Sequence, residues 1–468
     1  MIRVLSTASE CVPLVKTGGL ADVAGALPAA LAPEGVEMRT LIPAYRPVKA
    51  ALTGGKVHDL GEVMGGSAHL LEARLGEAVL YALDAPHLFD REGGPYLDAS
   101  GRDFDDNPER FAALSQVAAL LAAEGIEGWH PDILHVHDWQ TALAPLYLAE
   151  RKPTRHPGTV LTIHNIAFQG MIPADRRMRL DLPEAGFTSD GYEFWGQISA
   201  LKVGLVWADR ITTVSPTYAE ELLTPEFGMG MEGVLTARRS DLSGILNGID
   251  RAAWTPPYKS PRGKAKHRAA LRREFELPEA DGPLCIVISR LSHQKGLDVL
   301  LDALPALIDH GGQLALLGSG DPALEAAFRQ AAQHRNVAVR IGYDEALSHR
   351  MMAGADAILV PSRFEPCGLT QLYGLSHGTL PVVARTGGLN DTVIDANPMA
   401  LQSGVATGLQ FQPVTASALA GTFARLHALW SEPAQWQKMM KNAMAQDVGW
   451  DVSARAYAAL YQDLTPET

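Results

Sequence analysis

The sequence predicts an α/β protein that contains two doubly wound parallel sheets. Short runs rich in valine, isoleucine and leucine alternate along the chain with longer segments of helical pattern. Most of these runs are continuously apolar, which is typical of strands buried on both faces of a parallel sheet. A proline-rich, basic passage at 246–268 separates two halves with the same rhythm. We therefore expect two Rossmann-like domains of similar size that face each other across a cleft.

The predicted elements follow this division. In the first half the strand candidates are 2–9, 38–44, 78–84, 133–138, 159–165 and 210–215. In the second half they are 284–290, 313–319, 337–343, 357–362 and 380–385. Amphipathic segments such as 108–126 lie between them and predict the covering helices. The domain boundaries that this gives are 1–245 and 246–454.

Composition excludes several classes of protein. The 468 residues carry a formal net charge of −13, which argues against a nucleic-acid-binding surface. We find no apolar run of about 18 residues that could span a membrane, and no signal peptide in the first residues. Three scattered cysteines are too few for a disulfide framework or a thiolate metal site. These features predict a cytoplasmic protein.

Polar and glycine residues gather where the predicted strands end. Ligands of doubly wound sheets bind outside the carboxyl ends of the strands, so this coincidence indicates a binding site. The residues concerned are Lys16, Gly18 and Gly19, Asp138, His164, Arg290 and Lys295, Glu365 to Gly368, and Arg385 with Gly387 and Gly388.

The first of these groups is the turn "KTGGL" at 16–20, before a predicted helix. Two glycines allow a tight turn and close approach of a ligand, and a helix N-terminus attracts anions. Lys16 adds a mobile positive charge. The simpler alternative is an ordinary strand-to-helix turn with a surface lysine. The same pattern returns as "RTGGL" at 385–389.

The second half offers two cations and a glutamate. Arg290 and Lys295 lie five residues apart across a turn, so both could reach one diphosphate; the alternative is two solvated surface cations. "FEPCGLTQLYG" places Glu365 before a helix that we expect to start near Gly368. The N–H groups of Cys367, Gly368, Leu369 and Thr370 would then bind phosphate, and Glu365 would accept hydrogen bonds from sugar hydroxyls.

Three other motifs point elsewhere and are weaker. Gly318, Gly320 and Ala323 match a dinucleotide fingerprint that Pro322 interrupts. His135, His137 and His164 could bind a metal, as in a metal-dependent hydrolase, but core histidines are common in such sheets. For the acidic run 103–106, the interpretation as a loop that caps a helix is favoured over that as a metal–diphosphate motif. We therefore expect no metal and no cofactor.

The motifs taken together resemble one family along essentially the whole chain. In order they are KTGGLADV, HDWQ, TIHNIAFQG, TTVSPTYAEE, EFGMGMEGVL, GILNGID, SRLSHQKG, GSGDP, PSRFEPCGLTQLYG and RTGGLNDTV. This series is similar to that of the bacterial glycogen (starch) synthases that use ADP-glucose. The resemblance implies the two-Rossmann GT-B fold, with a C-terminal helix at 455–468 that returns to the first domain.

The resemblance also implies an activity and residue roles. Glucose would pass from ADP-glucose to the non-reducing end of an α-1,4-glucan such as glycogen, with retention at the anomeric carbon. Lys16, Arg290 and Lys295 would contact the diphosphate, Glu365 the glucose hydroxyls, and His164 the anomeric centre. The remaining implied contacts are Asp138 and Asn247 on the glucose and acceptor side, Tyr343 on adenine, and Asp22 at the donor loop.

One position departs from the wider group of retaining transferases. Those enzymes have a second glutamate eight residues after the first, where this chain has Tyr373, as do bacterial glycogen synthases. The alternatives left open are a UDP-glucose-using transferase with another acceptor, the metal-dependent hydrolase, and a non-catalytic glucan-binding protein.

Overall fold

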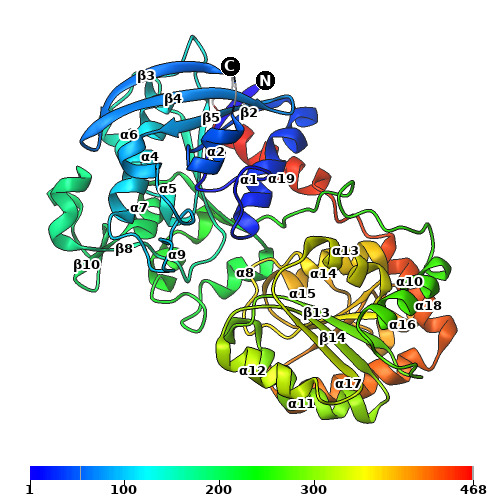
Figure 1. The fold of residues 1–468 in the computed structure, drawn as a ribbon. Helices are drawn as coiled ribbons and strands as arrows, with labels where there is room; N and C mark the ends of the chain where they lie inside the picture. Colours follow the sequence, from blue (N-terminus) through cyan, green and yellow to red (C-terminus); the bar gives the residue numbers. More distant parts are fainter. Residues whose placement is uncertain (53, 466–468) are drawn as a thin grey trace. The chain divides into compact units, whose positions relative to one another are not determined.

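A computed structural model describes residues 1–52 and 54–465, which form two compact units. The N-terminal unit comprises Met1–Val214, Ala219–Asn247 and Trp450–Thr468. The C-terminal unit comprises Ser215–Tyr218 and Gly248–Gly449. Each unit is a sheet covered by helices (Figure 1). The chain thus changes unit inside the passage at 246–268 and again after Gly449.

The N-terminal unit contains a nine-stranded sheet in the order β12-β11-β7-β6-β1-β2-β5-β4-β3. All pairs are parallel from β12 to β5, and β4 is antiparallel to both β5 and β3. The strands are β1 (Ile2–Thr7), β2 (Val36–Pro43), β3 (Lys56–Val63), β4 (Gly66–Leu75), β5 (Ala78–Asp84), β6 (Ile133–His137), β7 (Gly158–Ile163), β11 (Arg210–Thr213) and β12 (Leu242–Gly244).

Helices cover this sheet, and a small second sheet lies beside it. The small sheet has the order β8-β10-β9, with β8 at Met171–Pro173, β9 at Glu193–Phe194 and β10 at Gln197–Ser199. The helices are α1 (Gly19–Leu31), α2 (Arg46–Ala51), α3 (Pro86–Phe89), α4 (Asn107–Glu124), α5 (Asp138–Thr141), α6 (Ala144–Arg151), α7 (Ala200–Trp207), α8 (Pro216–Glu221), α9 (Glu232–Ala237) and α19 (Asp451–Leu464). None of the described helices of the chain is long and apolar enough to cross a membrane.

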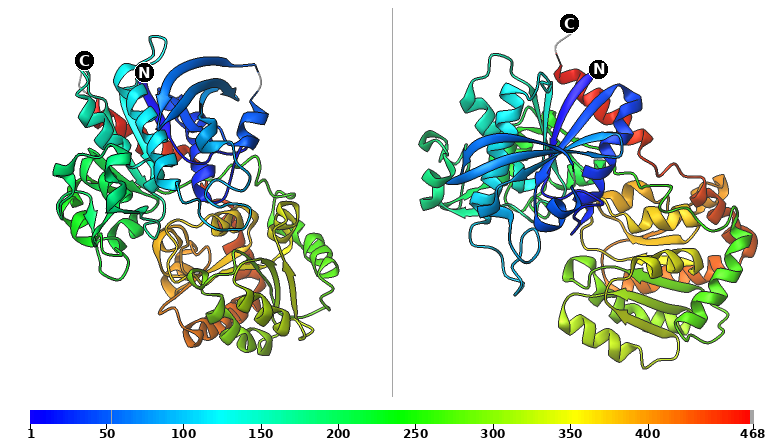
Figure 2. Two further views of the ribbon diagram at one scale, coloured as in Figure 1. Left: turned by 60° about the vertical axis from the view of Figure 1, so that its left-hand side comes forward. Right: turned by 45° about the horizontal axis from the view of Figure 1, so that its top comes forward.

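The C-terminal helix α19 belongs to the N-terminal unit, which confirms the returning helix that the resemblance implied. Its Tyr457 and Tyr461 are completely buried in one apolar cluster with Val23 and Leu27 of α1. The Ser453 hydroxyl donates a hydrogen bond to the carbonyl of Leu246. The last helix therefore completes the core of the first sheet (Figure 2).

The C-terminal unit contains a wholly parallel sheet in the order β15-β14-β13-β16-β17-β18. Its strands are β13 (Leu284–Ile288), β14 (Gln313–Gly318), β15 (Val337–Ile341), β16 (Ala357–Val360), β17 (Leu380–Ala384) and β18 (Leu409–Phe411). Its helices are α10 (Lys264–Glu274), α11 (Leu297–Asp309), α12 (Pro322–Ala331), α13 (Glu345–Gly354), α14 (Thr370–His377), α15 (Gly387–Thr392), α16 (Pro398–Ser403), α17 (Ala416–Trp430) and α18 (Pro433–Met444).

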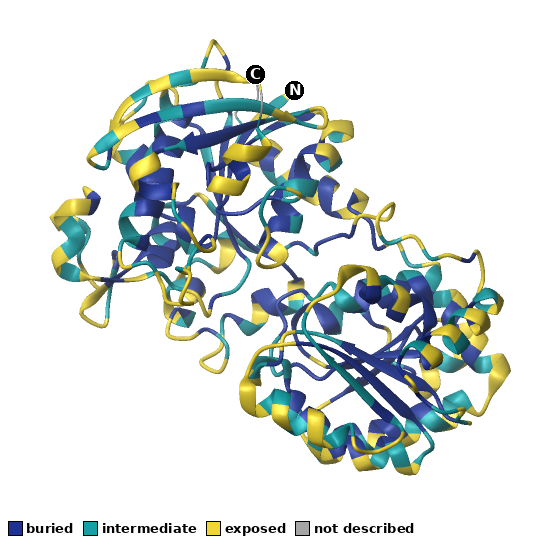
Figure 3. Cartoon of the chain, viewed as in Figure 1, coloured by how far each residue is buried: buried dark blue, intermediate teal, exposed yellow. Residues whose placement is uncertain are grey.

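Two separate apolar clusters lie against the two faces of this sheet. One contains Leu300 of α11 and Phe423 of α17, and the other contains Leu271 of α10 and Met351 of α13. The central strands are buried along their length, whereas the helices alternate buried and exposed residues (Figure 3). This arrangement is the doubly wound fold that the continuous apolar runs predicted.

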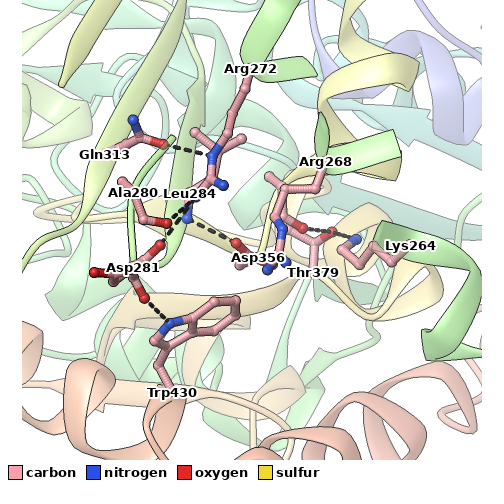
Figure 4. Close-up of polar contacts among 12 residues, drawn as sticks. Lys264, Arg268, Arg272, Ala280, Asp281, Leu284, Gln313, Asp356, Thr379 and Trp430 are labelled. Carbon is pink, nitrogen blue, oxygen red and sulfur yellow. Dashed lines mark hydrogen bonds and ion pairs between the residues drawn. The ribbon is translucent and has the colours of Figure 1, made fainter. Parts of the chain in front are cut away.

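A polar cluster holds α10 at the amino ends of the strands of this sheet (Figure 4). Ligands of such folds bind at the opposite, carboxyl ends of the strands. Lys264 donates to the hydroxyl of Thr379 at 2.6 Å, and Arg268 pairs with Asp356 at 3.3 Å. Burial lowers the pKa of Lys264 to about 7. Because Lys264, Arg268 and Arg272 lie four residues apart on one face of α10, these basic residues have a structural role as an anchor of the helix.

Candidate active site

The Lys16 turn lies beyond the carboxyl end of β1 and leads into α1. Its ammonium group is half-exposed and forms an ion pair of 2.7 Å with Asp22 in the first turn of the helix. Gly18 has an extended backbone at the N-cap, and a Cβ placed there would meet no heavy atom within 4 Å. The turn therefore presents a lysine, an open glycine and the first N–H groups of a helix at one place.

A buried carboxylate holds this turn, and the sequence analysis missed it. Glu10 is 2% exposed and accepts hydrogen bonds from the backbone N–H and the hydroxyl of Thr17, the latter at 2.5 Å. The Tyr96 hydroxyl donates to the same carboxylate and also contacts Ser9 Oγ at 2.8 Å. No motif marks Glu10, and only its place after β1 in an otherwise uncharged stretch could have drawn attention to it.

Asp138 lies at the carboxyl end of β6 in a left-handed conformation, with φ of 54°. Its Oδ1 accepts the backbone N–H of His164 at 2.7 Å, which ties the end of β6 to the end of β7. Burial raises the pKa of Asp138 to about 7, and the negative charge of Glu10 adds to this increase. The carboxyl group therefore changes its protonation state near neutral pH.

His164 is part of a buried hydrogen-bonded pair. Its Nε2 lies 3.0 Å from Nδ1 of His137, and Nε2 of His137 lies 3.1 Å from the hydroxyl of Ser6. Burial lowers the pKa of His164 to about 3 and lowers that of His137 well below its usual value. Both imidazoles are therefore neutral at physiological pH.

The third histidine of the proposed metal set faces other partners. His135 contacts the Tyr461 hydroxyl at 2.7 Å through Nδ1 and the Thr162 hydroxyl at 2.6 Å through Nε2. Both ring nitrogens of His135 and of His137 are thus engaged with protein groups. Among the described residues, no three His, Cys, Asp or Glu side chains are arranged to hold a metal ion. This geometry counts against the metal-dependent hydrolase.

In the C-terminal unit, the ends of β13 and β16 bring Lys295 and Glu365 together. Lys295 Nζ lies 2.6 Å from Glu365 Oε2, and the Ser362 hydroxyl donates to the same oxygen at 2.8 Å. Lys295 is one-fifth exposed and Glu365 is buried, whereas Arg290, which lies two residues beyond the end of β13, is exposed. A cation and a buried carboxylate therefore pair at the carboxyl ends of these strands.

The loop after Glu365 differs from its prediction in one respect. Helix α14 begins at Thr370, two residues later than the expected start at Gly368, because Gly368 adopts a left-handed conformation with φ of 69°. The side chain of Gln371 donates to the carbonyls of Cys367 and Gly368 at 3.0 and 2.9 Å. Cys367 to Leu369 thus form a fixed turn ahead of the helix.

The Arg385 turn supports this loop. Gly388 N–H donates to the carbonyls of Glu365 and Pro366, both at 3.1 Å. A Cβ on Gly387 would come within 2.0 Å of the Glu365 carbonyl oxygen, and one on Gly388 within 2.2 Å of that of Cys367. The Arg385 side chain does not take part in these contacts. Its Nε donates to the Gln410 side chain at 2.9 Å, and the residue lines a cavity of about 440 Å³.

Two further predicted site residues lie in segments outside the turns described above. Asn247 is buried at the end of the N-terminal unit, and Tyr343 is exposed just after β15. The other motifs have structural roles. Asp321 accepts the N–H groups of Ala323 and Leu324 at the start of α12, where a dinucleotide phosphate would bind.

The acidic run 103–106 also has a structural role, although not the one predicted. The Asp106 side chain makes no cap hydrogen bond to α4 and pairs instead with Arg91, one contact being 2.6 Å. The expectation of a side-chain cap was therefore wrong.

The comparisons with known proteins agree with this geometry. The family model of the starch synthase catalytic domain matches residues 3–237, and that of the glycosyl transferases group 1 matches residues 270–443. The catalytic domain of starch synthase IV from Arabidopsis thaliana, solved with ADP and acarbose, superimposes with a TM-score of 0.86 at 30% identity over the full length of both chains. A sucrose-phosphate synthase from Thermosynechococcus elongatus shares the fold with a TM-score of 0.62 at 19% identity over 99% of both chains. The chain therefore has the GT-B fold and is a glycosyltransferase.

Two curated relatives are more similar. The glycogen synthase of Paracoccus denitrificans is 65% identical over 99% of both chains, and that of a Jannaschia species is 56% identical over the same share. The chain belongs to the glycogen synthase family. It is an enzyme of glycogen synthesis that transfers glucose from a nucleotide sugar to a glucan.

Proposed function

We propose that the nucleotide sugar is ADP-glucose and that glucose is transferred to the non-reducing 4-hydroxyl of an α-1,4-glucan with retention at the anomeric carbon. The ADP bound to the Arabidopsis starch synthase supports the choice of nucleotide. Cys11, Cys285 and Cys367 are buried and form no disulfide with one another, which fits action in a reducing cytoplasm.

The observation that carries the proposal is the Lys295–Glu365 pair, which lies at the strand ends of the C-terminal unit. Glu365 forms an ion pair with Lys295 at 2.6 Å. A diphosphate would compete for Lys295 and Arg290, while Glu365 would accept hydrogen bonds from glucose hydroxyls. The N–H groups at the start of α14 add donors for the distal phosphate. Tyr343 is proposed to stack on the adenine.

The N-terminal unit supplies the other proposed contacts. The Lys16 turn has the charge and the open glycine of a phosphate contact, and Asp22 holds Lys16 until a phosphate replaces it. His164 is proposed to lie at the anomeric centre, with Asp138 and Asn247 on the glucose and acceptor side. The neutral His137–His164 pair fits a site where the positive charge develops on the sugar rather than on the protein.

We propose front-face transfer. The bond between the anomeric carbon and the diphosphate oxygen breaks, and the acceptor 4-oxygen bonds to the same face of that carbon. The proton of the acceptor hydroxyl passes to the leaving phosphate oxygen. Among the carboxylates of the sequence motifs, Asp138 is the candidate for a covalent nucleophile. Its Oδ1, however, accepts a hydrogen bond from the backbone N–H of His164. This contact favours a role for Asp138 in positioning over one as a nucleophile.

Kinetics of Lys295→Ala and Arg290→Ala test the diphosphate contact. Loss of one charge-assisted contact that strengthens in the transition state should cost about 3 kcal/mol, or about 100-fold in kcat. Arg329→Ala is a matched control, because this exposed arginine lies on α12 and forms an ion pair with Glu325 of the same helix. Near-normal turnover of both site variants would refute the proposed contact.

A donor panel tests the nucleotide. We expect ADP-glucose to give a much higher kcat/KM than UDP-glucose with glycogen as acceptor, and nuclear magnetic resonance of the first product to show an α-linkage. Preference for UDP-glucose would support the alternative transferase instead.

A further inference from the structure

An exposed aromatic platform lies on the small sheet of the N-terminal unit. Trp195 is 82% exposed and has a left-handed conformation, with φ of 53°, in the tight turn between β9 and β10. This conformation is unusual for a bulky residue, and the exposed indole leaves a large apolar surface in water. The positive φ belongs to the two-residue turn that Trp195 forms with Gly196, whereas the exposed indole contributes nothing to the core and points to a ligand.

Other apolar side chains extend the surface around Trp195. Phe168 is 55% exposed, and Met171 and Met229 are 38% and 39% exposed. Phe194 meets the Trp195 ring edge to face at 6.0 Å between centroids. We call the surface formed by Phe168, Met171, Phe194, Trp195 and Met229 the aromatic platform.

Three contacts bring together the segments that carry these side chains. Gln169 Nε2 donates to the Met229 carbonyl at 3.0 Å, which joins the loop before β8 to the loop before α9. A Cβ on Gly230 would lie 2.8 Å from the Phe194 ring, so the second loop packs against the turn that carries Trp195. Strand β8 pairs with β10, with Met171 opposite Ser199.

We propose that the aromatic platform binds an α-glucan chain, with a glucose ring stacked on Trp195. This inference rests on the proposed function, because it assigns a surface to the chain of the acceptor beyond its reacting sugar. The platform begins three residues after Asn165, next to His164, and the Phe168 N–H group donates to the Asn165 carbonyl at 3.2 Å. A glucan whose end lies at His164 could therefore continue along Phe168 towards Trp195.

The chemistry of the surroundings selects a neutral, hydroxyl-rich ligand. The carbon-bound hydrogens of a sugar ring are slightly positive and pack on the negative face of an indole. Glu193 and Glu232 flank the platform, where Glu193 accepts the Gly196 N–H at 2.7 Å and Glu232 that of Gly230 at 2.8 Å. Carboxylates can accept hydrogen bonds from sugar hydroxyls, but they repel an anionic lipid surface or a nucleic acid.

The test compares Trp195→Ala with Trp195→Phe and with Met178→Ala. Met178 is 78% exposed on the segment after β8 and is not part of the platform, so it is a matched control for loss of an exposed apolar side chain. Native gel electrophoresis through glycogen measures binding directly and needs no donor. We expect Trp195→Ala to weaken retardation about tenfold, Trp195→Phe to weaken it less, and Met178→Ala to leave it unchanged.

Kinetics give the second measurement. With ADP-glucose as donor, Trp195→Ala should raise KM for glycogen about tenfold and change kcat/KM for maltotriose less than twofold. If the wild-type enzyme transfers no glucose, the proposed function is refuted. The gel measurement still tests whether the aromatic platform binds glucan, because it needs no donor. Equal retardation of wild type and Trp195→Ala would overturn the inference. So would a change from dimer to monomer in sedimentation of the variant, which would identify the platform as a contact between copies.

Discussion

Two turns with the sequence Thr-Gly-Gly-Leu follow parallel strands in the two units, yet their glycines do different things. Gly18 faces open space, whereas Gly387 and Gly388 pack against the carbonyls of Glu365 and Cys367. Lys16 stays next to its turn in an ion pair with Asp22, whereas Arg385 bonds to Gln410 and faces a separate cavity. One motif therefore forms an open turn, which we propose as a phosphate contact, and the other supports the loop that carries Glu365.

The largest expected difference is in the free energy of unfolding when a glycine of each turn is replaced by alanine. Gly388→Ala places a Cβ against a backbone carbonyl that cannot move without displacing the Glu365 loop. We predict that the free energy of unfolding falls by about 3 kcal/mol in urea titrations. Gly18→Ala should change it by less than about 0.5 kcal/mol. Equal losses would show that both turns serve packing.

The next effect separates the two cations. Lys16→Ala should raise KM for ADP-glucose about tenfold, because one contact of a charge with the donor phosphate is lost. Arg385→Ala should change that KM less than about twofold, since the guanidinium group hydrogen-bonds to Gln410. Steady-state kinetics at saturating glycogen measure both. A larger effect at Arg385 than at Lys16 would reverse the comparison.

The pH dependence gives a third distinction. We expect kcat to fall as pH decreases through about 7, because Asp138, whose pKa burial raises to about 7, becomes protonated and holds the His164 N–H group less strongly. Glu10, which anchors the Lys16 turn, adds to that increase. Glu10→Gln should therefore move the inflection to lower pH by about half a unit.

Two controls accompany the pH profiles. Arg385→Ala should leave the inflection in place, and Asp138→Asn should remove it, because the amide does not titrate. Persistence of the inflection in Asp138→Asn would assign it to another group.

The smallest effect concerns the ion pair of the Lys16 turn. Both members of this pair are partly exposed, so Asp22→Asn should change the free energy of unfolding by less than about 0.5 kcal/mol. In the proposed site, Asp22 would compete with the donor phosphate for Lys16, so we predict that KM for ADP-glucose falls about twofold. An increase in KM would mean that Asp22 orients Lys16 for the donor.

The fold was largely predictable from hydrophobic pattern. Every predicted strand run contains a strand, because a buried parallel strand must be apolar on both faces. The hairpin of β3 and β4 was missed, since it lies at the sheet edge and much of it is exposed. The short strands β12 and β18 at the other edges have too few residues for a periodic signal.

The site was predictable in outline but not in its connections. Strand ends located Lys16, Asp138, His164, Lys295 and Glu365 because topology places ligands there. The buried contacts that hold them, such as Glu10 with Thr17 and His137 with His164, join residues distant in sequence or without a motif. The role of Gly388 also escaped prediction, because a glycine that binds a ligand and one that packs against a loop look identical in a sequence.

Hydrogen–deuterium exchange with and without ADP tests the difference between the two turns most directly. Without ADP, the amides of Gly18 to Leu20 should exchange rapidly, and those of Gly388 to Asn390, which are bonded to carbonyls of the unit, should exchange slowly. We predict that ADP slows exchange at Gly18 to Leu20 and leaves Gly388 to Asn390 as they were. Protection confined to Gly388 to Asn390, with no change at Gly18 to Leu20, would contradict the assignment of the two turns.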